Sequence, residues 1–201
     1  MQIYENCLNI GEKKFMYYNT AKRKVFISYY HGDQEAVNKF VEDYSDVFIS
    51  RTVGVKDGDF DFDSNNPQYI MRRIREEKLQ DSTVTIVLIG CCTHSRRYVD
   101  WEIKASLQQG QSLPNGLIGI NLPYMGNASA APERLVDNLE KDRQGNNVGY
   151  ARYYVYPCSK TELRSWIEDA YNARISRASL INNRKDMMKY NQKCKKHGIT
   201  H

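Results

Sequence analysis

Apolar runs and helical patterns alternate along the chain. Short runs rich in β-branched and aromatic residues predict five strands, at residues 24–29, 46–50, 83–90, 116–122 and 151–156. Between them the apolar spacing becomes helical, which predicts helices from about residue 33, from Pro67, from 97 to 109 and from 160 to 173, with a short helix after Pro132. Right-handed crossovers then give an α/β fold with a five-stranded parallel sheet and helices on both faces.

The run from Thr83 to Gly90 is the strongest strand signal, and it lacks alternation, so it is expected to be a central strand covered on both faces. In such sheets ligands bind outside the carboxyl ends of the strands. The loops expected there are residues 28–33, 50–66, 90–97 and 122–131. Their glycines form neither GxGxxG nor a P-loop, which argues against a Rossmann dehydrogenase and an NTPase.

The length of 201 residues, with 41% hydrophobic residues, fits one folded domain with appendages. We expect an N-terminal extension over residues 1–23, the α/β domain over 24–175 and a basic C-terminal tail over 176–201. The tail holds seven Lys and Arg residues against one acid, so the rest of the chain is nearly neutral. We expect a solvated amphipathic helix there, peripheral to the chemistry and dispensable for folding, and nucleic acid is not expected as a partner.

We expect neither a membrane segment nor a signal peptide in this sequence. No apolar run approaches the roughly 18 residues of a membrane span, so we expect a cytoplasmic protein. The five cysteines form no CxxC pair, and their odd number favours reduced thiols over a disulfide framework or a zinc site. Four aspartates between Asp57 and Asp63 alternate, but they lack the glycine and glutamate of an EF-hand. No metal is expected.

Two segments resemble parts of TIR domains. Val25-Phe-Ile-Ser-Tyr29 resembles their first strand, and Thr85–Gly90, followed by a polar loop and Tyr98-Val-Asp-Trp-Glu102-Ile, resembles their third strand and catalytic helix. The resemblance spans about residues 24–175. The Trp101-Glu102 pair, the Gly116–Pro123 strand and the long insertion after it are most similar to the TIR-like proteins of bacterial Thoeris anti-phage systems. The resemblance implies a flavodoxin-like TIR fold.

The resemblance also implies a catalytic residue. In TIR domains that cleave NAD⁺, the catalytic glutamate lies on the helix after the third strand, usually four residues beyond a tryptophan. Tyr98 and Glu102 hold the matching positions here. Residues four apart share one helical face, so the aromatic ring can shield the carboxylate and flank the substrate ribose. NAD⁺ is then the substrate, and no cofactor is implied.

One carboxylate suits this chemistry. Nicotinamide leaves a cationic glycoside as a neutral molecule, so the general acid of an ordinary glycosidase is dispensable. Cleavage builds positive charge on the ribose, which a nearby anion such as Glu102 stabilises. The structural alternative for Glu102 is a solvated glutamate on the surface of a helix.

Further residues are expected to border the NAD⁺ pocket because they follow the first and third strands or flank the glutamate. They are Ser28, Tyr29, Tyr30, His31, Asp33, Thr93, Ser95 and Tyr98. Local alternatives exist for several of them. Ser28 and Asp33 can cap the next helix, Thr93 and Ser95 can cap the helix that carries Glu102, and His31 can be an exposed loop residue.

Three functions remain open at this stage. The first is an NAD⁺ glycohydrolase or cyclase that makes a cyclic ADP-ribose-type second messenger in anti-phage defence, with a phage-derived trigger, a separate effector and a homo-oligomer as expected partners. The second is a non-catalytic TIR interaction module that acts by homotypic assembly. The third is an enzyme similar to nucleoside deoxyribosyltransferases, which also use a glutamate at a glycosidic centre.

Overall fold

The computed structural model describes residues 21–53, 66–110, 112–126, 130–198 and 200. Its strands are β1 (Lys24–Ser28), β2 (Ile49–Val53), β3 (Val84–Ile89), β4 (Gly116–Asn121) and β5 (Arg152–Tyr154). They form one sheet in the order β2-β1-β3-β4-β5, and every neighbouring pair is parallel. The predicted five-stranded parallel sheet is confirmed, and its order is that of flavodoxin-like folds.

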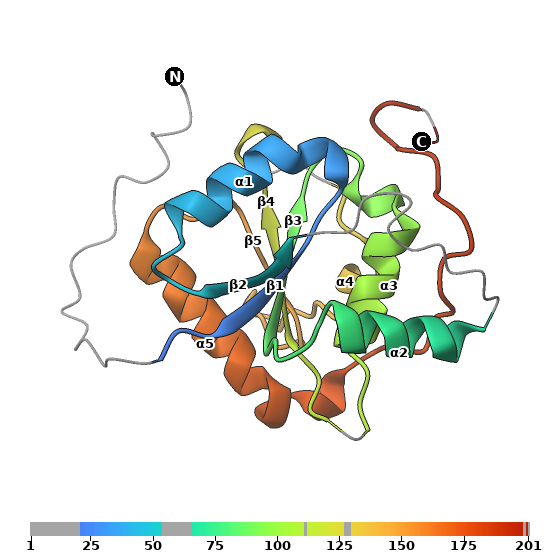
Figure 1. Ribbon diagram of the computed structural model, residues 1–201. Helices are drawn as coiled ribbons and strands as arrows, with labels where there is room; N and C mark the ends of the chain where they lie inside the picture. Colours follow the sequence, from blue (N-terminus) through green and yellow to red (C-terminus); the bar gives the residue numbers. More distant parts are fainter. Residues whose placement is uncertain (1–20, 54–65, 111, 127–129, 199, 201) are drawn as a thin grey trace.

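Helices cover both faces of this sheet, as predicted. They are α1 (Gln34–Asp43), α2 (Pro67–Glu77), α3 (Arg97–Ser106), α4 (Glu133–Val136) and α5 (Lys160–Ser176). In Figure 1, α1 and α5 lie to the left of the sheet, whereas α2, α3 and α4 lie to its right. Within the described residues, no helix is long and apolar enough to cross a membrane.

The alternation of side chains along β1 assigns its residues to the two faces. Val25 and Ile27 pack with α1 and α5, whereas Phe26 packs with α2 and α3. Every residue of β3 is buried, as its unbroken apolar run predicts. Residues of β1 with even numbers therefore face the layer that contains α3, because successive side chains of a strand point to opposite faces.

The second strand lies three residues later than the apolar run suggests. It was predicted at residues 46–50 and begins at Ile49. Val47 and Phe48 are nonetheless buried, and they join the core beside α1 before the strand begins. The apolar residues of this run therefore mark core positions in a turn as well as the strand itself.

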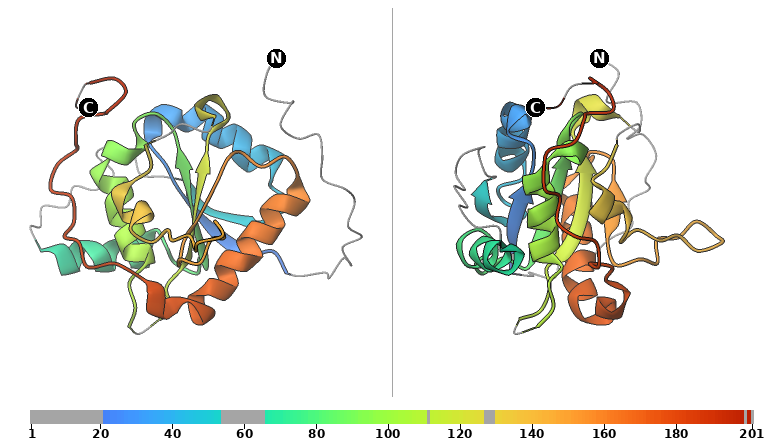
Figure 2. Two further views of the ribbon diagram at one scale, coloured as in Figure 1. Left: turned by 180° about the vertical axis from the view of Figure 1, so that it is seen from behind. Right: turned by 90° about the vertical axis from the view of Figure 1, so that its right-hand side faces the viewer.

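The C-terminal segment is not the predicted solvated helix. After a short 3-10 turn at Ala178–Leu180, residues 181–198 have no regular secondary structure and run along α3; we call them the C-terminal strap. Figures 1 and 2 show the strap in red beside α3. Met188 is held at both ends of its backbone, because its N–H donates to Asp100 (2.9 Å) and its carbonyl accepts from the Trp101 indole (2.8 Å).

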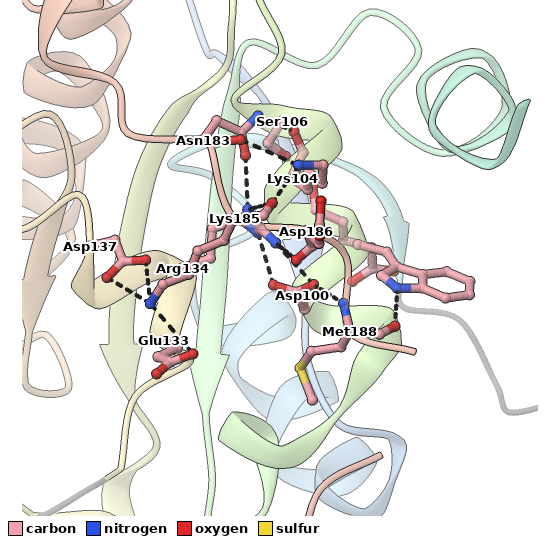
Figure 3. A network of polar contacts seen from close by, with 12 residues as sticks. Asp100, Lys104, Ser106, Glu133, Arg134, Asp137, Asn183, Lys185, Asp186 and Met188 are labelled. Carbon is pink, nitrogen blue, oxygen red and sulfur yellow. Dashed lines mark hydrogen bonds and ion pairs between the residues drawn. The ribbon is translucent and has the colours of Figure 1, made fainter. Parts of the chain in front are cut away.

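A buried arginine organises the contact between the strap and α3. Arg134 of α4 forms an ion pair with Asp100 (2.8 Å) and also donates to the carbonyl groups of Lys185 and Asp186. Figure 3 shows this network. The expectation of a solvated tail was wrong because the strap packs against the domain, largely through backbone carbonyl groups that a pattern of side chains does not reveal.

Candidate active site

The polar groups of interest gather at the carboxyl edge of the sheet. From β1 the chain crosses to β2 on one side and then returns past β1 to β3, so the topological switch point lies between β1 and β3. Ligands of such sheets bind in the crevice there. Short 3-10 turns follow three central strands: His31–Asp33 after β1, Thr93–Ser95 after β3 and Pro123–Met125 after β4.

Glu102 lies beneath this edge and is joined to the end of β1. Its side chain projects from α3 toward the sheet, the residue is only 2% exposed, and its Oε2 atom accepts a hydrogen bond of 2.5 Å from Ser28 Oγ. Ser28 is the last residue of β1 and lies on the same face as Phe26. The alternative of a solvated helical glutamate is therefore wrong, and so is a capping role for Ser28.

The second carboxylate oxygen of Glu102 has unused hydrogen-bonding capacity. Among the described residues, Oε1 is buried without a hydrogen-bond partner. Burial raises the pKa of Glu102 to about 8, although the hydrogen bond from Ser28 and the charge of Lys78 act in the opposite direction. A cation placed beside this carboxyl group would favour its ionised form.

A buried polar chain fixes the backbone of α3 below Glu102. The Ser106 hydroxyl donates to the Glu102 carbonyl (2.8 Å) and also forms a hydrogen bond with the Thr85 hydroxyl (2.7 Å). Asn115 donates to Thr85 at 3.2 Å. Because Thr85 belongs to β3, these contacts join the helix to the central strand and fix the position of Glu102 relative to β1.

Arg96, at the end of the β3 loop, is a buried cation whose charge acts on the Asp33 carboxylate and the Cys92 thiol. It is 4% exposed, and its guanidinium carbon lies 3.8 Å from the centroid of the Tyr30 ring. None of its three nitrogen atoms has a hydrogen-bond partner among the described residues. Gly32 makes room for the Tyr30 ring, because a Cβ there would come within 2.5 Å of it. Unpaired guanidinium donors at a strand end suit a phosphate or another anion.

Asp33 connects the loops after β1, β3 and β4. Its Oδ1 accepts a hydrogen bond of 2.5 Å from the Tyr124 hydroxyl, and a Cβ at Gly90 would lie 2.2 Å from its carboxylate. Burial raises the pKa of Asp33, despite the Tyr124 hydrogen bond and the charge of Arg96. Asp33 does not cap α1 with its side chain, so the capping alternative was wrong.

Three other predicted pocket residues serve local structure. Tyr29 points to the opposite face, where it joins the core of α1 and α5 and donates to Gln34 (2.6 Å). Thr93 accepts from the Gly90 amide (2.9 Å), and Ser95 donates to the Cys92 carbonyl (2.8 Å). Both hydroxyls therefore stabilise the turn after β3, and neither caps the helix that carries Glu102, so the capping alternative was wrong.

His31 and Tyr98 lie at the margins of the site. His31 is exposed and packs edge-on against Tyr30, with 4.7 Å between the ring centroids. Tyr98 is half-buried one helical turn before Glu102, its ring edge-on to Trp101 at 5.3 Å. Its hydroxyl accepts from Arg97 (2.8 Å), and the ring packs against the cluster between α2 and α3.

Sequence reasoning missed Arg96 and Tyr124. Both lie in strand-end loops that the topology rule had already selected, and this position was the available signal. The sequence shows neither the burial of Arg96 nor the reach of Tyr124 across to Asp33, since both depend on how three loops meet. Asp57, Asp59, Asp61 and Asp63 lie outside the described residues.

The fold and the site define a TIR-like α/β domain with a buried glutamate at its switch point. The family model described as Thoeris protein ThsB, TIR-like domain, matches residues 26–127, and the chain belongs to this family. A comparison with curated proteins finds no match. The matched segment runs from β1 past β4, so it includes Ser28, Arg96 and Glu102.

Proposed function

We propose that this protein cleaves NAD⁺ at the bond between nicotinamide and ribose, with Glu102 as the catalytic carboxylate. The observation that carries the proposal is the buried Glu102 carboxyl group, which Ser28 holds at the switch point between β1 and β3. Membership in the Thoeris ThsB family supports the same activity in anti-phage defence.

The electrostatics of Glu102 fit a cationic glycoside. Without a ligand, burial favours the protonated carboxyl group at neutral pH. The positive nicotinamide ring of NAD⁺ would favour ionisation, so the anion forms where the substrate needs it. When the glycosidic bond breaks, its electron pair leaves with the nicotinamide nitrogen, and positive charge develops on the ribose beside the carboxylate.

The fate of the ribosyl cation decides the product. Attack by water, with loss of a proton, gives linear ADP-ribose. Attack by a hydroxyl or base nitrogen of the same molecule gives a cyclic ADP-ribose-type messenger, and we propose that this is the product. Burial of Glu102 favours the cyclic outcome, because a site that excludes water removes the competing nucleophile.

Arg96 and Tyr30 supply a binding place for the rest of the substrate. The three unpaired nitrogens of Arg96 match the oxygens of a pyrophosphate, and the Tyr30 ring holds the guanidinium from one side. Tyr30 follows Ser28 by two residues, and Arg96 precedes Glu102 by six. The anion site and the carboxylate therefore belong to the same two chain segments.

The remaining parts of the proposal concern the cell. The protein acts in the cytoplasm, a phage-derived signal triggers it, and its diffusible product acts on a separate effector. A homo-oligomer is the proposed active state. The membership in a Thoeris family supports this arrangement.

A non-catalytic interaction module is the second candidate, and one observation favours it. Glu102 is nearly fully buried and hydrogen-bonded, as a structural residue would be. The two candidates differ in what Glu102→Gln does. The catalytic candidate predicts loss of nicotinamide release, whereas the interaction module predicts that neither the wild-type chain nor the variant consumes NAD⁺.

The experiment measures nicotinamide and ADP-ribose products by mass spectrometry in cells that express the full chain, before and after phage infection. Infection is included because the activity can require a trigger. Glu102→Gln is compared with Glu76→Gln, which changes an exposed glutamate on α2. Equal nicotinamide release by wild type and Glu102→Gln would exclude Glu102 as the catalytic group, and no release by any chain would favour the interaction module.

A further inference from the structure

Three side chains that bind soft metals meet beside the turn after β3. Cys92 precedes this turn, while Cys194 and His197 lie near the end of the C-terminal strap. The two sulfur atoms are 3.0 Å apart, Cys92 Sγ lies 3.3 Å from His197 Nδ1, and all three ligand atoms lie within 4.8 Å of one another. Neither cysteine is in a disulfide.

We propose that Cys92, Cys194 and His197 form a binding site for Zn²⁺ that fastens the C-terminal strap to the turn after β3. Two thiolates and one imidazole are a common donor set for zinc, and three protein ligands leave a fourth position for water or another ligand. Tetrahedral zinc with ordinary bond lengths places two sulfurs about 3.8 Å apart and sulfur about 3.5 Å from nitrogen. Small side-chain rotations would bring the three groups to these spacings.

The backbone around Cys194 is already arranged as a ligand turn. The Cys194 thiol donates to the Cys91 carbonyl (3.4 Å), which joins this turn to the segment that carries Cys92. The Gly198 amide donates to the Cys194 carbonyl (2.7 Å), and the φ of +67° at Gly198 closes the turn, a conformation that favours glycine.

His94 supports this turn from the other segment. Its Nε2 atom accepts a hydrogen bond of 3.1 Å from the Lys195 amide, next to Cys194. His94 is buried and lies two residues after Cys92. Its hydrogen bond with Lys195 therefore joins the segment that carries Cys92 to the segment that carries Cys194. It is not part of the cluster of three ligand atoms.

The choice of zinc follows from the donor set and its location. Thiolate and imidazole ligands favour zinc over calcium or magnesium, which take oxygen ligands. The two cysteines are separated by 102 positions in the chain. A bound ion would therefore close a long loop and fix the strap at the point where the chain enters α3. The sequence-based expectation of no metal overlooked this set, because its ligands come from two distant segments.

The sulfur atoms of Cys92 and Cys194 lie 3.0 Å apart, close enough for oxidation to join them. Oxidation of Cys92 and Cys194 to a disulfide is therefore the main competitor of the zinc site. The two alternatives differ in a measurable way, since a disulfide removes both thiols and binds no metal.

The first test measures zinc by elemental analysis of the full chain, purified without a polyhistidine tag, loaded with Zn²⁺ under reducing conditions and then dialysed. We expect one zinc per chain in wild type and in Cys91→Ser, a matched control whose sulfur contacts Met125 instead of the cluster. Cys92→Ser, Cys194→Ser and His197→Gln should weaken zinc binding by more than about 100-fold, because outer-shell changes alone weaken it by roughly 10- to 100-fold. His197 is exposed, so its substitution leaves the core intact.

Two further readouts address the ligands and the strap. Cobalt in place of zinc should give a thiolate charge-transfer band that falls by about half when one cysteine is replaced. Tryptic cleavage between Lys193 and Lys196 should slow when zinc is bound, because the strap is then held. The proposal is overturned if the reduced chain binds no stoichiometric zinc, if Cys91→Ser loses zinc as Cys92→Ser does, or if mass spectrometry finds Cys92 and Cys194 joined as a disulfide in the protein isolated from cells.

Discussion

The Oγ atom of Ser28 donates a hydrogen bond of 2.5 Å to the Oε2 atom of Glu102, which joins the end of β1 to the middle of α3. This contact satisfies one carboxylate oxygen and leaves the other without a partner among the described residues. It also opposes the effect of burial on the pKa of Glu102. The contact therefore sets both the position and the protonation of the proposed catalytic group.

Removal of the Ser28 hydroxyl should raise the pKa of Glu102 further. For Ser28→Ala we expect kcat/KM for NAD⁺ at pH 7 to fall by roughly 10- to 100-fold, since a hydrogen bond to a charged group contributes about 1.5–3 kcal/mol. The pH at half-maximal kcat/KM should also move upward, whereas Ser28→Thr keeps a hydroxyl and should restore part of the activity. An unchanged pH profile in Ser28→Ala would show that the hydroxyl does not tune the carboxylate.

Glu102→Gln should change the stability of the protein in a pH-dependent way. The pKa of Glu102 rises from an ordinary 4.5 to about 8 on folding, so its contribution to stability is complete below pH 4.5 and is lost as the pH rises towards 8. Glutamine resembles the protonated acid and does not titrate. The Tm of Glu102→Gln should therefore match wild type near pH 4.5 and exceed it increasingly up to pH 8. The corresponding difference in the free energy of unfolding has an upper limit of about 5 kcal/mol. Thermal melts of both proteins and of Glu76→Gln test this, and a constant Tm difference would contradict the raised pKa.

Arg96→Met should separate binding from stability. Loss of the buried guanidinium removes the cost of burying its charge but also removes its contact with the Tyr30 ring and its attraction to Asp33, so we expect only a small change in Tm. The KM for NAD⁺ should increase by roughly 10- to 100-fold with a smaller change in kcat, since a charged hydrogen bond to phosphate is lost. Arg143→Met, an exposed control, should change neither quantity. An unaltered KM in Arg96→Met would remove Arg96 from the substrate site.

Tyr98→Ala should reduce activity more than Tyr98→Trp. The half-buried Tyr98 ring lies one helical turn before Glu102, and we propose that an aromatic side chain there limits the access of water to the carboxyl group. Where cyclisation occurs, the alanine variant should release a larger share of linear ADP-ribose, which mass spectrometry quantifies. The same product ratio in both variants would argue against this role.

Deletion of residues 181–201 should destabilise the domain, in contrast to the sequence-based expectation. The strap supplies carbonyl acceptors to the buried Arg134. The Met188 backbone also donates a hydrogen bond to the Asp100 carboxylate and accepts one from the Trp101 indole. Each buried polar group left unsatisfied costs about 1–3 kcal/mol. We expect a lower Tm and a smaller yield of folded protein, measured by thermal melts of the purified chains. A truncated chain that melts with wild type would show that the strap contributes nothing.

Much of the fold could be predicted because strands and helices leave periodic signals. The five strands, their parallel order and the position of Glu102 after the third strand all follow from such signals and from the resemblance to TIR domains. The same reasoning could have predicted the face of the sheet on which the Tyr29 side chain lies. Tyr29 lies one residue beyond Ser28, so the alternation of a strand sends the two side chains to opposite faces.

Other features depend on contacts that no local pattern encodes. In the sequence, Arg96 cannot be distinguished from an ordinary surface arginine. In the folded protein, the loops after β1 and β3 bury it. The strap has few apolar residues, and it is held by its carbonyl groups and by one arginine from α4. Cys92 and Cys194 are 102 positions apart, so spacing rules for metal ligands do not detect them.

The two acidic residues Asp100 and Glu102 lie on different sides of α3, and their surroundings restrict how the site can open. Arg134 and the Met188 amide hold both oxygens of Asp100, and Ser28 holds one oxygen of Glu102. Rotation of α3 about its own axis would break all of these contacts together. Under the proposed function, we expect a dinucleotide to reach the buried carboxyl group when the strand-end turns separate while the helix keeps its position. Among the described residues, the hydrogen bond between Tyr124 and Asp33 joins two of these turns through an exposed tyrosine, so we expect the separation to begin there.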